Sequence, residues 1–164
     1  MSDYEPNPQV KQFLERLRTL RPGDRAQLKR SAGMSLSEAT QVIGLFYRLL
    51  PLGVAAYNEP HYFLIATLFP LTDEGGKGNL GVALRHISPK TKSGERNPLD
   101  RRVEILLDAD ATQFPFRLRQ ALRLLKSKDV KVNWQSLAED ILSWGHPNRF
   151  VQKNWAKAYF SQFE

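Results

Sequence analysis

Basic side chains are the chemically distinctive feature of this sequence, and they concentrate in one segment. Residues 111–131 hold six Lys or Arg and one acid, Asp129. If this segment is a helix that turns 100° per residue, Arg119, Arg123 and Lys126 form one stripe along it. A face that serves only solubility normally mixes both signs of charge. We therefore predict a phosphate-binding surface. For any one of these Lys or Arg residues alone, an ordinary solvated helix face remains an alternative.

Residue types that catalyse hydrolysis or group transfer are scarce and poorly spaced. The histidines, His61, His86 and His146, form no i, i+4 pair and have no carboxylate at metal-ligand spacing. Asp108 and Asp110 stand at i, i+2, which on a helix points them about 200° apart. A helix boundary nearby favours an N-cap role for Asp110. We therefore predict a protein that is not an enzyme, with no catalytic residue, no metal site and no cofactor.

Two other kinds of site are disfavoured by composition and spacing. The chain has no cysteine, which excludes disulfides and thiolate sites and is compatible with a reducing compartment. The segment "GGKGNLG" differs from a phosphate-binding loop because Lys77 is followed by Gly78 instead of Ser or Thr, and no strand precedes it. We interpret this segment as a flexible linker.

The overall charge and the short apolar runs indicate the class of partner. The formal net charge is +7, which favours polyanions such as nucleic acid or an acidic membrane surface. The run "YFLIATLF" is far shorter than the roughly 20 residues of a membrane-spanning helix. We expect a cytoplasmic protein that does not associate with membranes.

The elements that must position these bases are all predicted to be helices. Apolar residues recur at helical spacing throughout, and proline or glycine ends each run. The predicted class is all-α, with two packed helical bundles and about eight helices. The predicted division is an N-terminal bundle over 1–71, a loop-rich connection with one short helix over 72–98, and a C-terminal bundle over 99–164.

Capping residues predict where several helices start. The predicted starting residues are Asp24, Ser35, Asn97, Asn133 and Pro147. The first two are followed three residues later by Gln or Glu, which is the spacing of a capping box. The asparagine at 97 precedes a proline, which is favoured at the first helical position.

Large apolar residues are assigned to the core by their helical positions. The predicted core residues are Phe46, Leu118, Ala121, Leu122, Leu125, Trp134, Trp144 and Trp155. The tryptophans share helix faces with aliphatic residues, which favours packing over base stacking. For Tyr47, which lies beside a basic residue, both interpretations remain open.

The order of several segments resembles one known family. These segments are "RAQLKR", "FYRLLPLG", "LGVALRHIS", "LDRRVEILLDAD", "ALRLLKS", "VNWQSLAEDILSWG" and "VQKNWAKAYF". Together they are similar to the CasB family, the small subunit of the type I-E CRISPR Cascade surveillance complex, over about residues 12–160. The resemblance implies an all-helical, non-enzymatic protein, present as two copies beside the crRNA-bearing backbone subunits and the large subunit. It also implies contacts to crRNA, to target DNA and to the displaced strand of the R-loop.

Matching segments imply which Lys and Arg residues contact nucleic acid. These residues are Lys29, Arg30, Arg48, Arg101, Arg102, Arg123 and Arg149. The chain departs from the family pattern at Val82, Asp108 and Ala111, where relatives can have basic residues. Either the nucleic-acid strand takes a different path here, or Arg117 and Arg119 supply the missing positive charge. For the two arginines at 101 and 102, a structural salt bridge to Asp100, Glu104 or Glu139 is the competing interpretation.

A second function class stays open from the sequence. The segment "SAGMSLSEATQV" has features of a helix-turn-helix, which would fit a free-standing DNA-binding or regulatory module. Such a module needs a recognition helix that follows a tight turn.

Overall fold

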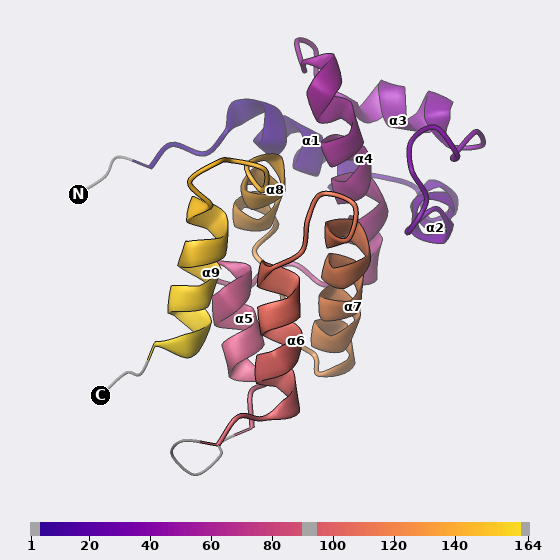
Figure 1. The fold of residues 1–164 in the computed structure, drawn as a ribbon. Helices are drawn as coiled ribbons and strands as arrows, with labels where there is room; N and C mark the ends of the chain where they lie inside the picture. Colours follow the sequence, from indigo (N-terminus) through magenta and orange to yellow (C-terminus); the bar gives the residue numbers. More distant parts are fainter. Residues whose placement is uncertain (1–3, 90–94, 162–164) are drawn as a thin grey trace. The chain divides into compact units, whose positions relative to one another are not determined.

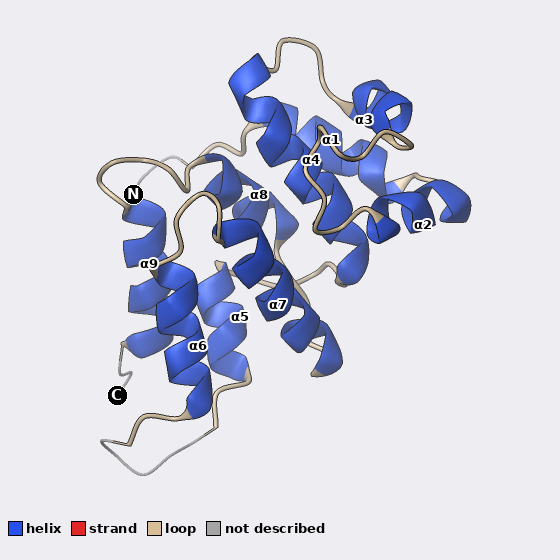
Figure 2. Cartoon of the chain, turned by 45° about the vertical axis from the view of Figure 1, so that its right-hand side comes forward, coloured by secondary structure: helices blue, strands red, loops and turns tan. Residues whose placement is uncertain are grey.

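The computed structural model describes residues 4–89 and 95–161, and these residues confirm the all-α prediction. Figures 1 and 2 show helices joined by loops, with no strand in the described residues. The α-helices are α1 (Pro8–Arg18), α2 (Pro22–Arg30), α3 (Ile43–Leu49), α4 (Glu59–Leu68), α5 (Leu80–His86), α6 (Pro98–Leu107), α7 (Phe114–Ser127), α8 (Trp134–Leu142) and α9 (Phe150–Phe160). Two 3₁₀ turns, Ala56–Asn58 and Phe69–Leu71, flank α4. The described residues contain one isolated parallel bridge, Glu74 to Val132, as expected of a fold without a sheet.

The chain forms two compact units, and their composition differs from the predicted division. The first unit comprises Met1–Leu71 with Trp134–Leu142, and the second comprises Thr72–Asn133 with Ser143–Glu164. Helix α8 therefore groups with the N-terminal helices, because its apolar face packs against α1 and α4. Helix α5 was expected in a loop-rich connection, yet it packs against α9 within the second unit.

Aromatic rings fill the core of the first unit. Phe13 makes edge-to-face contacts with Phe46 and Tyr62, at centroid distances of 6.4 and 5.0 Å. The ring of Trp134, at the start of α8, lies 5.6 Å from that of Phe69. Phe46 and Trp134, the two predicted core residues of this unit, are therefore confirmed, since 0% and 1% of their surfaces are exposed. Helical spacing places these rings on one face of each helix, where they meet.

The second unit is built around two tryptophans and one close helix contact. Trp144 stacks on Phe114 at 3.9 Å and donates a hydrogen bond from its indole nitrogen to the Ala109 carbonyl. Trp155 lies 5.1 Å from Trp144, so the predicted burial of these two residues is also confirmed. Gly81 of α5 lies against the backbone of Trp155, where a Cβ atom would be 2.3 Å from the carbonyl oxygen.

Some predicted helix starts are confirmed and others are wrong. Asn97 and Asp100 form a capping box at the start of α6, as predicted for Asn97. Asp24 does not start α2, which begins at Pro22 because proline fixes a helical φ and has no N–H to cap. Arg149 has left-handed backbone angles, so α9 begins at Phe150 and not at Pro147.

The predicted capping box at Ser35 forms one of its two hydrogen bonds and starts no helix. The Glu38 carboxylate accepts from the Ser35 backbone N–H at 3.1 Å and from its hydroxyl at 2.6 Å. The backbone there forms turns, and α3 begins only at Ile43. The Glu38 backbone N–H donates to the Ser35 carbonyl and not to the Ser35 hydroxyl, so the two residues close a turn and do not cap a helix.

Tyr159 gives an expected pH dependence of stability. Burial, together with the hydrogen bond that its hydroxyl donates to Asp100 at 2.7 Å, raises the pKa of Tyr159 from 10.0 to about 12. A raised pKa in the folded state stabilises the protein below pH 10, and this contribution is lost as the pH rises toward 12. Urea denaturation across this window should show a smaller loss for Tyr159→Phe than for the wild type.

Tyr4 contributes an alkaline loss of its own to both proteins. Burial and the Glu139 carboxylate raise the pKa of Tyr4 to about 12 as well, so the Phe variant should keep part of the alkaline loss. Identical pH profiles for the two proteins would contradict the role of Tyr159.

Candidate nucleic-acid interface

Helix α7 has the two faces that its sequence predicted. Phe114, Leu118, Leu122 and Leu125 are buried along one side, which confirms the core stripe, and Ala121 is half-buried beside them. This apolar face holds the helix against the rest of the second unit and thereby sets the direction of the neighbouring basic side chains. The helix is thus a rigid support for charge.

The three bases of the predicted stripe have different surroundings. Arg123 is exposed and has no ion pair within residues 4–89 and 95–161. Lys126 is exposed too, but its Nζ atom lies 2.6 Å from a carboxylate oxygen of Asp73. Arg119 is half-buried, and its Nε atom is buried without a hydrogen-bond partner in the described part of the chain. The stripe therefore offers one fully available guanidinium, one ammonium shared with an acid, and one partly covered guanidinium.

Helix α6 carries two further arginines that were predicted to bind. Arg101 and Arg102 are both exposed. Their competing acids, Asp100, Glu104 and Glu139, accept hydrogen bonds from other groups. No ion pair to either arginine occurs among the described residues, so the salt-bridge interpretation has no support.

Arg149 makes a structural contact. Its guanidinium donates a hydrogen bond of 2.7 Å to the carbonyl of Leu107, the last residue of α6. Carbonyls at a helix end have no partner within the helix, so this contact caps α6. The sequence does not indicate this role, because 42 residues separate the two partners.

The remaining predicted bases lie in the first unit. Lys29 and Arg30 are exposed in the last turn of α2, where positive charge also complements the helix dipole. Arg48 is exposed on α3. The other seven predicted residues, from Arg101 to Arg149, belong to the second unit. Within that unit the structure brings α6 and α7 into contact.

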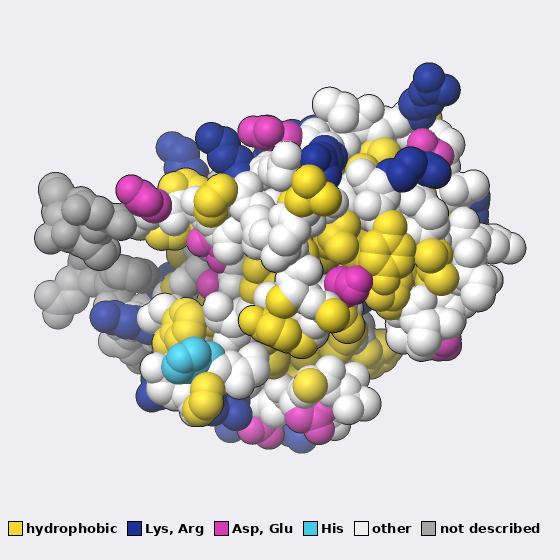
Figure 3. Space-filling view, turned by 90° about the horizontal axis from the view of Figure 1, so that it is seen from above, with side chains coloured by type: hydrophobic (Ala, Val, Ile, Leu, Met, Phe, Trp, Pro, Cys, Tyr) yellow, Lys and Arg dark blue, Asp and Glu magenta, His cyan; other side chains and the backbone are white. Residues whose placement is uncertain are grey.

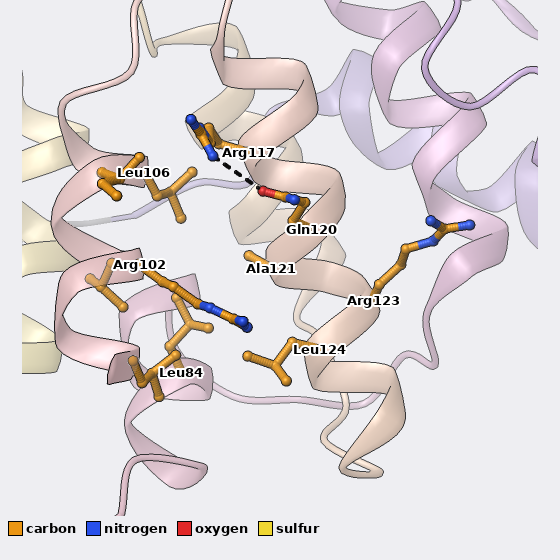
Figure 4. Close-up of a pocket in the computed structure, with 11 residues that line it drawn as sticks. Leu84, Arg102, Leu106, Arg117, Gln120, Ala121, Arg123 and Leu124 are labelled. Carbon is orange, nitrogen blue, oxygen red and sulfur yellow. Dashed lines mark hydrogen bonds between the residues drawn. The ribbon is translucent and has the colours of Figure 1, made fainter. Parts of the chain in front are cut away.

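A groove lies beside these arginines and is lined by α5, α6 and α7. Its volume is about 540 Å³, and we call it the α6–α7 groove. Its apolar lining consists of Leu84, Leu99, Val103, Ile105, Leu106, Ala121 and Leu124. Its polar lining consists of Arg102, Arg117, Gln120 and Arg123. Figure 4 shows Arg102 reaching from α6 toward α7, whereas the guanidinium of Arg123 points away on the far side of α7.

Other candidate sites receive no support from the described residues. On the face drawn in Figure 3, Lys and Arg side chains stand in ones and twos, with Asp and Glu among them. No group of three His, Asp or Glu side chains that could hold a metal occurs in residues 4–89 and 95–161. None of the described helices is long and apolar enough to cross a membrane.

For Tyr47, the sequence left open whether the ring packs in the core or stacks on a nucleobase. The ring is not buried, since 47% of the surface of Tyr47 is exposed.

The helix-turn-helix alternative does not fit the observed backbone. Residues 31–42 form turns and contain no helix, so they separate α2 from α3. A helix-turn-helix joins its two helices by a turn of about three or four residues. The segment therefore does not present a recognition helix.

Comparison with known proteins identifies the family. The family model described as CRISPR-associated protein Cse2 matches residues 24–160. The chain belongs to the CRISPR-associated Cse2 family. The resemblance to CasB proteins of type I-E Cascade is thereby confirmed, because solved structures of similar proteins carry both the CasB and the Cse2 name.

Several relatives have similar sequences or folds. A Cse2 protein of Thermus thermophilus is 35% identical over 103 residues, which cover 63% of this chain and only 57% of that protein. The CasB structure from Thermus thermophilus has a TM-score of 0.79 at 26% identity, covering 92% of this chain and 97% of that one. The CasB structure from M. ruber has a TM-score of 0.75 at 27% identity, covering 95% and 94%.

A more distant match shows the fold alone. A chain of a structure titled "CRISPR RNA-guided surveillance complex" has a TM-score of 0.74 at 19% identity, covering 92% of this chain and 91% of that one. This chain therefore shares its all-helical fold with a chain whose sequence differs widely from it.

Proposed function

We propose that this Cse2 protein is a non-catalytic small subunit of a type I-E CRISPR Cascade complex that binds nucleic acid. The observation that carries the proposal is a pair of exposed arginines on the packed helices α6 and α7, Arg101 and Arg123, with no acid partner in the described part of the chain. Family membership supports the setting, and the related fold found within a surveillance complex agrees with it. No catalytic role is part of the proposal.

The proposed partners are crRNA, target DNA and its displaced strand, together with the large subunit, the backbone subunits and a second copy of this chain. Guide RNA pairing with DNA exchanges one duplex for another of similar stability, so modest protein contacts can shift the balance. Arginine suits this role because its planar guanidinium engages two phosphate oxygens at once. The protein would stabilise the R-loop by electrostatics and not by chemistry.

Replacing the α7 stripe tests the proposal. In the variant Arg119→Ala, Arg123→Ala, Lys126→Ala, we expect weaker binding to single- and double-stranded DNA, about equal for unrelated sequences, because phosphate contacts carry no base information. Each lost phosphate contact should reduce the slope of log K against log salt by roughly 0.7 to 0.9. The fold should persist, because alanine favours helix and an exposed pair such as Lys126 with Asp73 contributes only about 0 to 1 kcal/mol.

A charge-matched control separates a local site from net charge. Lys11, Lys153 and Lys157 are exposed on α1 and α9, and none is a predicted contact. Their triple alanine variant loses the same three charges but should keep the wild-type salt slope. In the assembled complex, only the α7 variant should reduce stable R-loop formation. Equal affinity and slope in both triple variants and the wild type would end the phosphate-binding role.

A further inference from the structure

The α6–α7 groove combines an aliphatic floor with unsatisfied positive charge. Its apolar lining is contributed by leucine, isoleucine, valine and alanine, and none of its lining residues is aromatic or acidic. At about 540 Å³ it lies within the range of built binding pockets. Ile105 extends this apolar surface to the rim, where 39% of its surface is exposed. Water is a poor occupant of such a floor, so an apolar ligand group would be favoured there.

Two arginines at the groove have hydrogen-bonding capacity to spare. Arg102 makes no hydrogen bond or ion pair within the described residues, and it projects toward the groove in Figure 4. Arg117 makes one long hydrogen bond, 3.5 Å, to Gln120, and its guanidinium lies 5.4 Å from the ring centroid of Phe116. Each guanidinium has five donors, so both can still bind a carboxylate or a phosphate.

The side chains that line the groove favour a carboxylate over the phosphate of a nucleic acid. Nucleobases bind proteins by stacking on aromatic rings or by hydrogen bonds to their edges. The groove lining offers no ring, and Gln120 is its one uncharged polar side chain. Aliphatic side chains on one face of a helix, in contrast, fit aliphatic grooves between helices. Charge complementarity then requires acidic residues beside those anchors, because the groove lining is cationic.

We propose that the α6–α7 groove binds a protein segment that has aliphatic anchors flanked by Asp or Glu. The anchors occupy the floor, and the flanking carboxylates bind Arg102 and Arg117. These two arginines then serve a protein partner and not a phosphate backbone, whereas Arg123, whose guanidinium points away from the groove, remains available to nucleic acid. The inference goes beyond the proposed function, because it holds whether or not the chain binds DNA.

Two synthetic peptides test the groove on the full chain. The first is a fluorescein-labelled amphipathic helix of about 15 residues with leucines at i, i+3 and i+7 and flanking Glu, and the second replaces each Glu by Lys. Fluorescence anisotropy should show saturable binding of the Glu peptide and at least about tenfold weaker binding of the Lys peptide. Amide chemical shifts in the wild-type protein should change mainly in α6 and α7.

Variants then assign the binding to named residues. Ile105→Asp should weaken the Glu peptide about tenfold, because it places a carboxylate on the apolar rim. The pair Arg102→Glu, Arg117→Glu should reverse the preference toward the Lys peptide. Arg101→Glu is the matched control, since Arg101 is exposed on the same helix but does not line the groove, and it should leave peptide affinity unchanged.

Two results would overturn this assignment. One is the absence of saturable binding by the Glu peptide, or shift changes confined to other helices, in the wild-type protein. The other is an oligo-dT that displaces the Glu peptide and shifts the same amides, which would make the groove a nucleic-acid site. Neither result depends on whether the variants fold.

Discussion

Leu122→Asp is expected to unfold the second unit. Leu122 lies in the middle of the buried α7 stripe, and 0% of its surface is exposed. The substitution removes its packing and places a carboxylate at a fully buried position. The free energy of unfolding should fall by at least about 4 kcal/mol, a large part of the stability of an ordinary domain. Loss of helical circular dichroism at 25 °C, or a strongly lowered melting temperature, would register it.

The adjacent residue is the control for this prediction. Arg123 is exposed on the same helix turn, so Arg123→Asp should leave the melting temperature within a few degrees of the wild type. DNA binding should respond in the opposite way, falling in Arg123→Asp although the protein is folded. A stable, fully helical Leu122→Asp protein would show that α7 does not pack as described.

Gly81→Ala should be nearly as damaging, through a single methyl group. The added Cβ would lie 2.3 Å from the Trp155 carbonyl oxygen and 3.0 Å from two further backbone atoms. Backbone cannot move aside as a flexible side chain can, so α5 and α9 must separate and lose packing around Trp155. We expect a loss of about 3 kcal/mol, measured by urea denaturation.

Gly44→Ala provides the comparison in another helix. Gly44 lies in α3, where a Cβ atom would meet only the Arg48 guanidinium, at 3.8 Å. Alanine favours helix over glycine by about 1 kcal/mol, so this variant should be as stable as the wild type or more so. If both glycine variants were equally stable, the close approach of α5 to α9 would be refuted.

The sequence alone determined the features that depend on neighbouring residues. Helical periodicity predicted the buried stripe of α7 and the burial of the three tryptophans, because residues three and four apart share a helix face. The helix start at Asn97 was readable for the same reason, since the N-cap and the proline after it are adjacent in sequence. The excess of base in residues 111–131 likewise needs no fold to be counted.

Local signals failed where the backbone had a second way to satisfy them. Ser35 and Glu38 have the spacing of a capping box, but their side chains bond to each other and close a turn. Arg149 has left-handed backbone angles, so α9 begins after it and not at Pro147. The local residue types do not predict a left-handed residue at this position. Local motifs thus indicated where hydrogen bonds form, but not always which element they belong to.

Only the tertiary structure decided how much of the basic charge is available. Lys126 is paired with Asp73, which lies 53 residues away, and Arg149 caps a helix 42 residues away. The grouping of α8 with α1 and α4, and the α6–α7 groove beside Arg102 and Arg117, also require segments that are distant in sequence. Periodicity assigns each residue to a face of its own helix, whereas the partner of that face is chosen by packing among helices that the periodicity does not relate.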